Sequence, residues 1–160
     1  IPIADEDVVH TAIVSAAERS GMDVADTPPL GRNAIRILVA DDHALARDAL
    51  VQILALADDF DVVGEAIDGL DAVEKARKLI PDVVLIDVTM PRLGGLDATR
   101  RITAEVPGVK VIGLSMHARE DMEPQMIAAG ATCYLQKLTP TDELFRAIRG
   151  VRDDVAAQTR

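Results

Sequence analysis

The chain has 160 residues and a formal net charge of -10 at pH 7, with 49% hydrophobic and 2% aromatic residues. This length and apolar content suit one domain with a sizeable core plus an extension. The negative charge and the lack of Trp argue against a nucleic-acid or anionic-membrane binder, because phosphate contacts need clustered Lys and Arg and base stacking needs aromatic rings.

The first 33 residues have the pattern of an amphipathic helix followed by a linker. Apolar residues recur at helical spacing from Asp5 to about Ser20, and acidic residues lie at the positive end of this helix. The stretch from Asp23 to Asn33 contains adjacent prolines and a glycine, which is typical of a linker. One helix cannot form a core, so we expect it to pack on the following domain, on a second copy of the chain or on an upstream module.

From residue 34 to 152 the sequence alternates between strand and helix patterns, and residues 153–160 are expected to form a tail. Strands are predicted at 35–40, 62–63, 83–87, 109–115 and 132–136, and helices at 44–56, 70–79, 96–105, 121–129 and 141–153. The first of these helices carries four apolar residues expected on one buried face: Leu45, Ala49, Ile53 and Leu56. Right-handed crossovers then predict an α/β, flavodoxin-like, doubly wound parallel sheet of five strands in the order 2-1-3-4-5, with an extra N-terminal helix.

The third predicted strand is the centre of this domain. Val83 to Ile86 are consecutive apolar residues, as in a strand buried on both faces of a parallel sheet. Asp87 ends the strand, where a buried charge is costly and more often has a functional than a packing role. Pro91 and the two glycines after it predict an irregular loop, which leaves Asp87 facing an open crevice.

Polar side chains also follow other strands, and in a doubly wound sheet these strand ends share one edge. They are Asp41 and Asp42 after the first strand, Asp87 after the third, Ser115 at the end of the fourth and Lys137 after the fifth. Clustered carboxylates repel one another unless their pKa values rise or a cation neutralises them, and oxygen ligands in a hydrated site favour Mg²⁺. Because a lysine and a hydroxyl bind phosphoryl oxygens, the set predicts phosphoryl transfer onto Asp87 as the nucleophile.

Residues 35 to about 150 carry a series of motifs in a recognisable order. They are Val39-Ala40-Asp41-Asp42-His43 with Arg47, then Asp87-Val88-Thr89-Met90-Pro91, Leu114-Ser115-Met116-His117 and Ala131-Thr132-Cys133-Tyr134-Leu135-Gln136-Lys137. This series resembles the receiver domain of response regulators in two-component signalling, which belongs to the CheY-like superfamily, and its details resemble the NarL/FixJ branch. The resemblance implies a phosphoacceptor that catalyses its own phosphorylation and dephosphorylation and is not otherwise an enzyme.

The resemblance also implies the partner and the metal. Asp87 would accept the phosphoryl group from the phosphohistidine of a sensor histidine kinase. Mg²⁺ would be held by Asp42, Asp87 and the backbone carbonyl of Thr89, with Asp41 acting through water. Lys137 would pair with the phosphoryl group.

Two further residues would couple phosphorylation to an output. By resemblance, Ser115 would hydrogen-bond to the phosphoryl group, and Tyr134 would turn inward in concert. The change would be read on the face made by the fourth helix, the fifth strand and the fifth helix of the domain. Thr89 and His117 lie at positions that tune the lifetime of the phosphoryl group in the family. Each of these residues, taken singly, also has a simpler structural interpretation. Asp41 could be no more than a helix cap, Lys137 a solvated lysine and Tyr134 a core aromatic residue.

The parent protein is the open question at this stage. NarL-like proteins usually carry a helix-turn-helix DNA-binding domain, and Val151 to Arg160 is too short to supply one. We expect a NarL/LuxR-type transcriptional regulator whose DNA-binding domain lies outside this sequence. The alternatives are a hybrid sensor kinase, a stand-alone receiver, or a pseudo-receiver that is never phosphorylated and serves as an interaction module.

Two other enzyme classes are disfavoured by the residues after the first strand. A flavin carrier needs a phosphate-binding loop there, whereas Ala40-Asp41-Asp42-His43 would repel phosphate. A haloacid-dehalogenase-like phosphatase needs a second Asp two residues after its nucleophile, and His43 occupies that position. The single cysteine, Cys133, cannot form an internal disulfide, which fits a cytoplasmic protein. We expect no membrane span and no direct nucleic-acid contact, with a homodimer possible.

Overall fold

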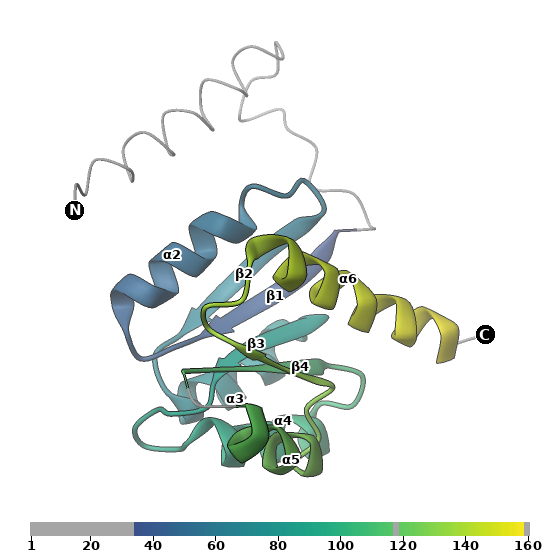
Figure 1. Ribbon diagram of the computed structural model, residues 1–160. Helices are drawn as coiled ribbons and strands as arrows, with labels where there is room; N and C mark the ends of the chain where they lie inside the picture. Colours follow the sequence, from purple (N-terminus) through teal and green to yellow (C-terminus); the bar gives the residue numbers. More distant parts are fainter. Residues whose placement is uncertain (1–33, 117–118, 159–160) are drawn as a thin grey trace. The chain divides into compact units, whose positions relative to one another are not determined.

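The computed structural model describes residues 34–116 and 119–158. In this part of the chain, strands and helices alternate from β1 to α6 (Figure 1). The strands are β1 (Ile35–Ala40), β2 (Phe60–Ala66), β3 (Val83–Asp87), β4 (Lys110–Ser115) and β5 (Cys133–Gln136). The helices are α2 (Ala44–Leu54), α3 (Gly69–Leu79), α4 (Gly95–Glu105), α5 (Arg119–Ala128) and α6 (Thr141–Gln158). The predicted N-terminal helix and His117 lie outside the described residues.

The strands form one parallel sheet in the order β2-β1-β3-β4-β5, which confirms the predicted topology. The register brings the carboxyl ends of neighbouring strands level with one another. Asp87 pairs with Leu114 on β4, and Ser115 pairs with Gln136 on β5. The order of strands reverses between β1 and β3, and the crevice outside such a reversal is where doubly wound sheets bind ligands.

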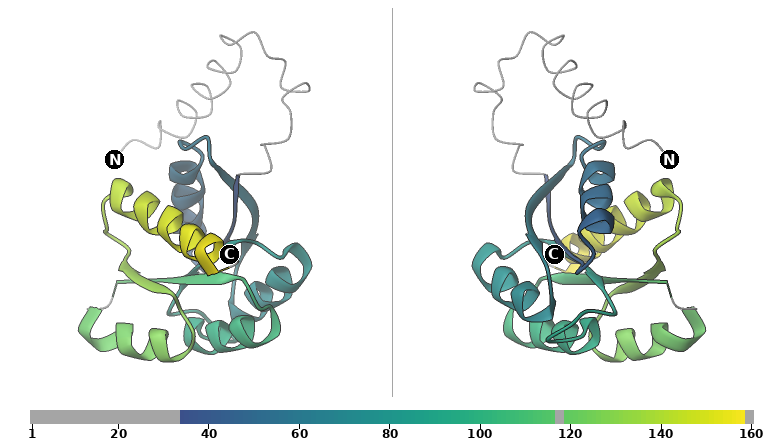
Figure 2. Two further views of the ribbon diagram at one scale, coloured as in Figure 1. Left: turned by 90° about the vertical axis from the view of Figure 1, so that its right-hand side faces the viewer. Right: turned by 90° about the vertical axis from the view of Figure 1, so that its left-hand side faces the viewer.

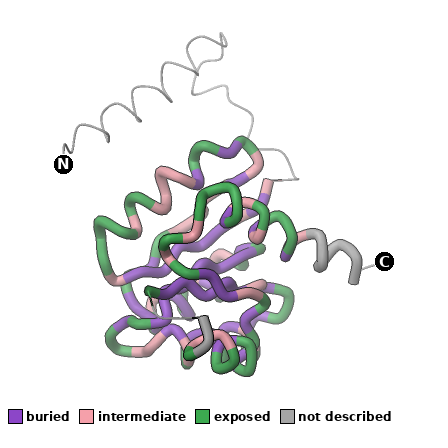
Figure 3. The backbone as a smooth tube through the Cα atoms, in the orientation of Figure 1, coloured by how far each residue is buried: buried purple, intermediate pink, exposed green. Residues whose placement is uncertain are grey.

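Helices cover both faces of the sheet, with α2 and α6 on one side and α3, α4 and α5 on the other (Figures 1 and 2). The residues of β1 alternate between the two cores. Ile35, Ile37 and Val39 pack towards α2 and α6, whereas Leu38 and Ala40 pack towards α3 and α4. Figure 3 shows this burial along the central strands, and β3 is buried at each of its residues, as a strand covered on both faces must be.

The prediction for the buried face of α2 is wrong. Leu45 is 81% exposed and Leu56 is 65% exposed, while Leu54 is buried and the half-buried Leu50 packs against the same core. Leu56 lies beyond the end of the helix. The buried side also carries Arg47, whose guanidinium reaches Glu65 and the carbonyl of Asp41. Because the inner face of α2 includes a charged residue, the spacing of apolar residues alone could not identify that face.

Two elements are much longer than predicted. β2 runs from Phe60 to Ala66; as an edge strand it pairs only with β1 in the described part of the chain, and it can carry the half-buried Asp61 and the exposed Glu65. Its register against β1 shifts between Ile37 and Leu38. α6 continues to Gln158.

Among residues 34–116 and 119–158, no helix has both the length and the apolar character needed to cross a membrane.

Candidate functional site

Asp87 lies at the carboxyl end of the central strand and is only 5% exposed. The loop that follows it folds back tightly, since the Gly95 amide donates a 2.9 Å hydrogen bond to the Val88 carbonyl. A Cβ at Gly95 would lie 2.1 Å from the Asp87 carbonyl oxygen. Glycine is therefore required where α4 begins, because only a residue without a side chain lets the helix start against the end of β3.

Two groups hold the Asp87 carboxylate. The Thr89 amide donates to Oδ1 at 3.2 Å, and Lys137 Nζ lies 3.2 Å from Oδ2. Burial raises the pKa of Asp87, and the nearby Asp41 charge adds to this rise, while Lys137 and the Thr89 amide oppose it. The residue is thus a buried carboxyl group whose charged form depends on neighbouring positive charge.

Lys137 is brought to the site by a continuation of the β4–β5 pairing. Its amide donates to the Ser115 carbonyl at 2.9 Å, one residue beyond the end of β5. Its Nζ then reaches Asp41 Oδ2 at 2.9 Å as well as Asp87. Burial alone would lower the pKa of Lys137, but the hydrogen bond to Asp41 and the charges of Asp87 and Asp41 outweigh that effect and raise it. Lys137 therefore carries a stable positive charge between two buried carboxylates.

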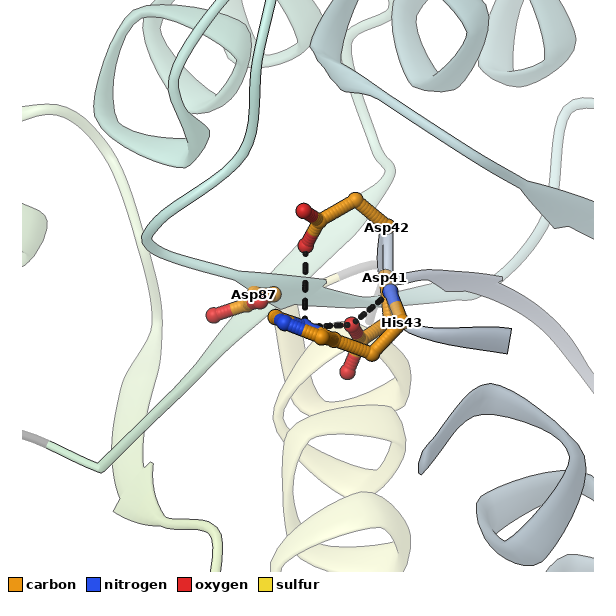
Figure 4. Close-up of side chains that lie close together, drawn as sticks. All are labelled: Asp41, Asp42, His43 and Asp87. Atoms are coloured by element: carbon orange, nitrogen blue, oxygen red, sulfur yellow. Dashed lines mark hydrogen bonds and ion pairs between the residues drawn. The ribbon is translucent and has the colours of Figure 1, made fainter. Parts of the chain in front are cut away.

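The turn after β1 supplies the remaining acidic groups (Figure 4). Asp41 is 5% exposed, and its Oδ1 accepts a 2.9 Å hydrogen bond from the His43 amide. The Asp42 side chain is 26% exposed, and its buried Oδ1 accepts no hydrogen bond from any described residue, although His43 Nδ1 lies 3.2 Å away. Ligand atoms from Asp41, Asp42, His43 and Asp87 all lie within 4.8 Å of one another.

This donor set fits a hard divalent cation. Carboxylate oxygens are the ligands that Mg²⁺ prefers, and a buried oxygen without a hydrogen-bond partner is the group that a cation would satisfy. His43 belongs to the motif quoted after the first strand but was not predicted from the sequence as a member of this cluster. Its position directly after two Asp residues was the available signal. Thr89 is exposed, and its backbone carbonyl as a metal ligand remains a prediction.

The two predicted switch residues lie in different surroundings. Ser115 is 1% exposed and is joined to Lys137 through the backbone hydrogen bond already described. Tyr134 is fully buried in the core on the α3, α4 and α5 side, paired with Gly113 on β4. A Cβ at Gly113 would lie 3.5 Å from the tyrosine ring. The ring thus already points inward in this structure.

A pocket of about 220 Å³ adjoins the acidic site and was not anticipated from the sequence. Asp41 and Lys137 line one part of it. The rest is mainly apolar and comes from α2, β4 and the start of α6: Ala46, Ala49, Leu50, Ile53, Leu114 and Leu144. The incorrectly predicted face of α2 explains the omission, because Ala49 and Ile53 line this pocket rather than the core.

Comparison with known proteins yields a consistent group. Residues 37–149 match the family model described as the response regulator receiver domain. The transcriptional regulatory protein DegU of Brevibacillus brevis is 39% identical over 122 residues, which cover 76% of this chain and 52% of DegU. The response regulator GacA of Pseudomonas viridiflava is 42% identical over 115 residues, which cover 72% of this chain and 54% of GacA. The chain thus spans about half the length of these curated relatives.

Solved structures match the same region. The signal receiver domain of a putative response regulator NarL from Mycobacterium tuberculosis superposes with a TM-score of 0.72 at 30% identity, covering 76% of this chain and 98% of that one. The response regulator domain of Thermotoga maritima CheB gives a TM-score of 0.68 at 32% identity, covering 75% and 97%. The receiver-domain fold is therefore shared with these domains.

Proposed function

This chain belongs to the family of response regulator receiver domains of two-component systems, and on that premise we propose that Asp87 is its phosphoacceptor. The observation that carries the proposal is the Lys137 side chain, whose Nζ contacts the buried carboxylates of both Asp41 and Asp87. A lysine held at this point can pair with phosphoryl oxygens as soon as they arrive on Asp87.

The proposed reaction is a phosphoryl transfer between two nucleophiles. A carboxylate oxygen of Asp87 attacks the phosphorus of a phosphohistidine on a sensor histidine kinase. The P–N bond breaks, its electron pair returns to the imidazole, and an acyl phosphate forms on Asp87. Attack of water on the same phosphorus later releases inorganic phosphate and restores the carboxylate. In this sense the domain catalyses its own phosphorylation and dephosphorylation.

We propose that Asp41, Asp42, Asp87 and the Thr89 backbone carbonyl hold Mg²⁺. When bound, the ion supplies positive charge that keeps these carboxylates ionised and neutralises phosphoryl oxygens. The orphaned Asp42 Oδ1 supports this assignment. Asp41 has the second task of holding Lys137, through the 2.9 Å contact with Nζ.

The proposed output begins at Ser115 and Tyr134. The Ser115 hydroxyl would donate a hydrogen bond to a phosphoryl oxygen, and this bond would favour the inward position of Tyr134 that the structure has. Because β4 and β5 carry these two residues, their movement would change the surface formed by α5, β5 and α6. That surface is the proposed contact for an output partner or for a second copy of the chain.

The proposed parent protein is a NarL/LuxR-type transcriptional regulator acting in the cytoplasm, where its kinase would phosphorylate it. The chain's similarity to DegU and GacA supports this parentage. A hybrid kinase or a stand-alone receiver remains the alternative architecture. We propose that residues 1–33 form a helix with its linker and that residues 34–152 form the receiver, whose last helix α6 continues into the C-terminal tail, residues 153–160. We propose no direct nucleic-acid or membrane contact for any of these parts.

The test is intact mass spectrometry after incubation with acetyl phosphate, with and without Mg²⁺. A Mg²⁺-dependent gain of one phosphoryl group in the wild-type protein, absent in Asp87→Asn, is the expected result. A gain that persists in Asp87→Asn would move the acceptor to another residue. No gain in the wild-type protein under any condition would identify a pseudo-receiver that acts only as an interaction module.

A further inference from the structure

The loop between β3 and α4, residues 88–94, is fastened to the neighbouring helix α3. Arg92 lies near the middle of this β3–α4 loop, and its guanidinium Nη2 and Nε lie 2.7 Å and 2.9 Å from Asp68 Oδ2. Asp68 is the N-cap of α3, and its Oδ1 accepts a 2.8 Å hydrogen bond from the Asp71 amide. Both oxygens of this 3% exposed carboxylate are therefore engaged, one by the helix and one by the loop.

The backbone of the loop lies against the same helix. A Cβ at Gly69, the first residue of α3, would lie 1.9 Å from the Leu93 carbonyl oxygen. The loop is thus held near its middle by Asp68 and Gly69 and at its far end by Gly95, which abuts the Asp87 carbonyl. The segment from Asp87 to Arg92, which precedes both anchors, carries the Thr89 amide, the donor to Asp87 Oδ1.

Arg92 adopts a backbone conformation that its residue type disfavours. Its φ is 64°, in the left-handed region that glycine tolerates and residues with a Cβ rarely occupy. Glycine would relieve this strain but would remove the guanidinium. A strained non-glycine residue beside a functional site is held by its surroundings, and here the charged contact with Asp68 is what holds it.

We propose that Arg92 is a positioning residue for the phosphoacceptor site. Through Asp68 it fixes the β3–α4 loop, so that Thr89 keeps its hydrogen bond to Asp87 and the acidic groups keep the spacing that a divalent cation needs. This inference rests on the proposed function for the nature of the cation. The contact also makes the N-terminus of α3 part of the support of the site. This support is indirect, because the Asp87 carboxylate is held by Thr89 and Lys137, which lie outside α3.

Isothermal calorimetry of Mg²⁺ binding and amide hydrogen exchange at Thr89 test the proposal. In Arg92→Ala we expect about tenfold weaker Mg²⁺ binding, the scale seen when outer contacts of a metal site are removed, together with faster exchange at Thr89. Arg92→Gly relieves the strain, so it should be more stable than Arg92→Ala in thermal unfolding yet lose as much Mg²⁺ affinity. Arg92→Lys keeps the positive charge but lacks the planar guanidinium, so its Mg²⁺ affinity should lie between those of wild type and Arg92→Ala.

Arg100→Ala is the matched control, because Arg100 is a similarly exposed arginine whose ion pair, with Asp97, lies within α4. It should leave Mg²⁺ affinity and Thr89 exchange unchanged. The proposal is overturned if Arg92→Ala lowers only the unfolding temperature, or if Arg92→Gly binds Mg²⁺ as wild type does. Failure of the proposed function would appear separately, as a wild-type protein that takes up no phosphoryl group, and the exchange rate at Thr89 would still report whether Arg92 holds the loop.

Discussion

Lys137 Nζ lies 3.2 Å from Asp87 although β4 separates their strands in the sheet. The same nitrogen lies 2.9 Å from Asp41, which follows β1, so one side chain connects the ends of β1, β3 and β5. A phosphoryl group on Asp87 would compete with Asp41 for Lys137, so that phosphorylation would change the contacts of the Lys137 side chain.

Asp87→Asn should abolish phosphorylation without unfolding the domain. The substitution removes the proposed nucleophile, but it keeps the size of the side chain and removes a charge whose burial is unfavourable, as the raised pKa of Asp87 indicates. Thermal unfolding without Mg²⁺ should therefore give an unfolding temperature equal to or above that of wild type. A large drop would show that the charge of Asp87 stabilises the fold.

Asp42→Asn should weaken Mg²⁺ binding by at least about tenfold, because it removes the charge of an oxygen left without a hydrogen bond. Bound Mg²⁺ at one hundred times its Kd would stabilise the wild-type fold by about 2.7 kcal/mol. Most of that gain should disappear in Asp42→Asn, as measured by thermal unfolding at matched Mg²⁺ concentrations. Asp48→Asn, an exposed carboxylate on α2, is the control and should keep the gain. Equal stabilisation of both variants would argue against Asp42 as a ligand.

The carboxyl ends of β1, β3, β4 and β5 could be predicted because local chemistry decides them. Val83 to Ile86 form an uninterrupted apolar run, and each polar residue that follows a strand belongs to a short motif whose residue types are specific. A parallel sheet then brings these ends to one edge, whatever the details of packing. The fold class and the grouping of Asp41, Asp87 and Lys137 follow from these two facts.

Other features depend on contacts between distant segments. The inner face of α2 includes Arg47, and the positions of Glu65 on β2 and of the Asp41 carbonyl explain why a charged residue lies there. The ion pair of Arg92 with Asp68 joins residues that are 24 positions apart in the sequence, and the local sequence around one residue does not indicate the other as its partner. Such pairs are set by tertiary packing, which no local pattern encodes.

Gly95→Ala should destabilise the protein by about 3 kcal/mol, since the new methyl group would overlap the end of β3 at the Asp87 carbonyl. The neighbouring Gly94 is a matched control. A Cβ there meets only the Val88 carbonyl oxygen at 3.8 Å, and its φ of -65° suits any residue. Gly94→Ala should therefore cost no more than about 1 kcal/mol at this N-cap. Chemical denaturation of both variants measures the difference, and equal losses would contradict the close approach seen at Gly95.

Asp59→Asn should destabilise the protein at neutral pH and lose this effect in acid. The two Asp59 oxygens accept hydrogen bonds from Arg149 on α6 at 2.8 Å each, and these bonds hold the pKa of Asp59 below its usual value of 3.8. A carboxyl group with a lower pKa in the folded state stabilises the fold above its unfolded pKa, and this contribution is lost as the pH falls through the folded value. The stability difference between wild type and Asp59→Asn, measured by urea denaturation, should therefore shrink below about pH 4.

Arg149 also lies over two aromatic rings, 5.0 Å from the centre of Phe60 and 5.6 Å from that of Phe145. These cation–π contacts do not titrate in acid, because the guanidinium stays charged. Arg149→Ala should consequently remain less stable than wild type at pH values where Asp59→Asn no longer differs from it. If both variants converge on wild type in acid, Arg149 stabilises the fold only through its ion pair with Asp59, and the two rings contribute only their packing against each other.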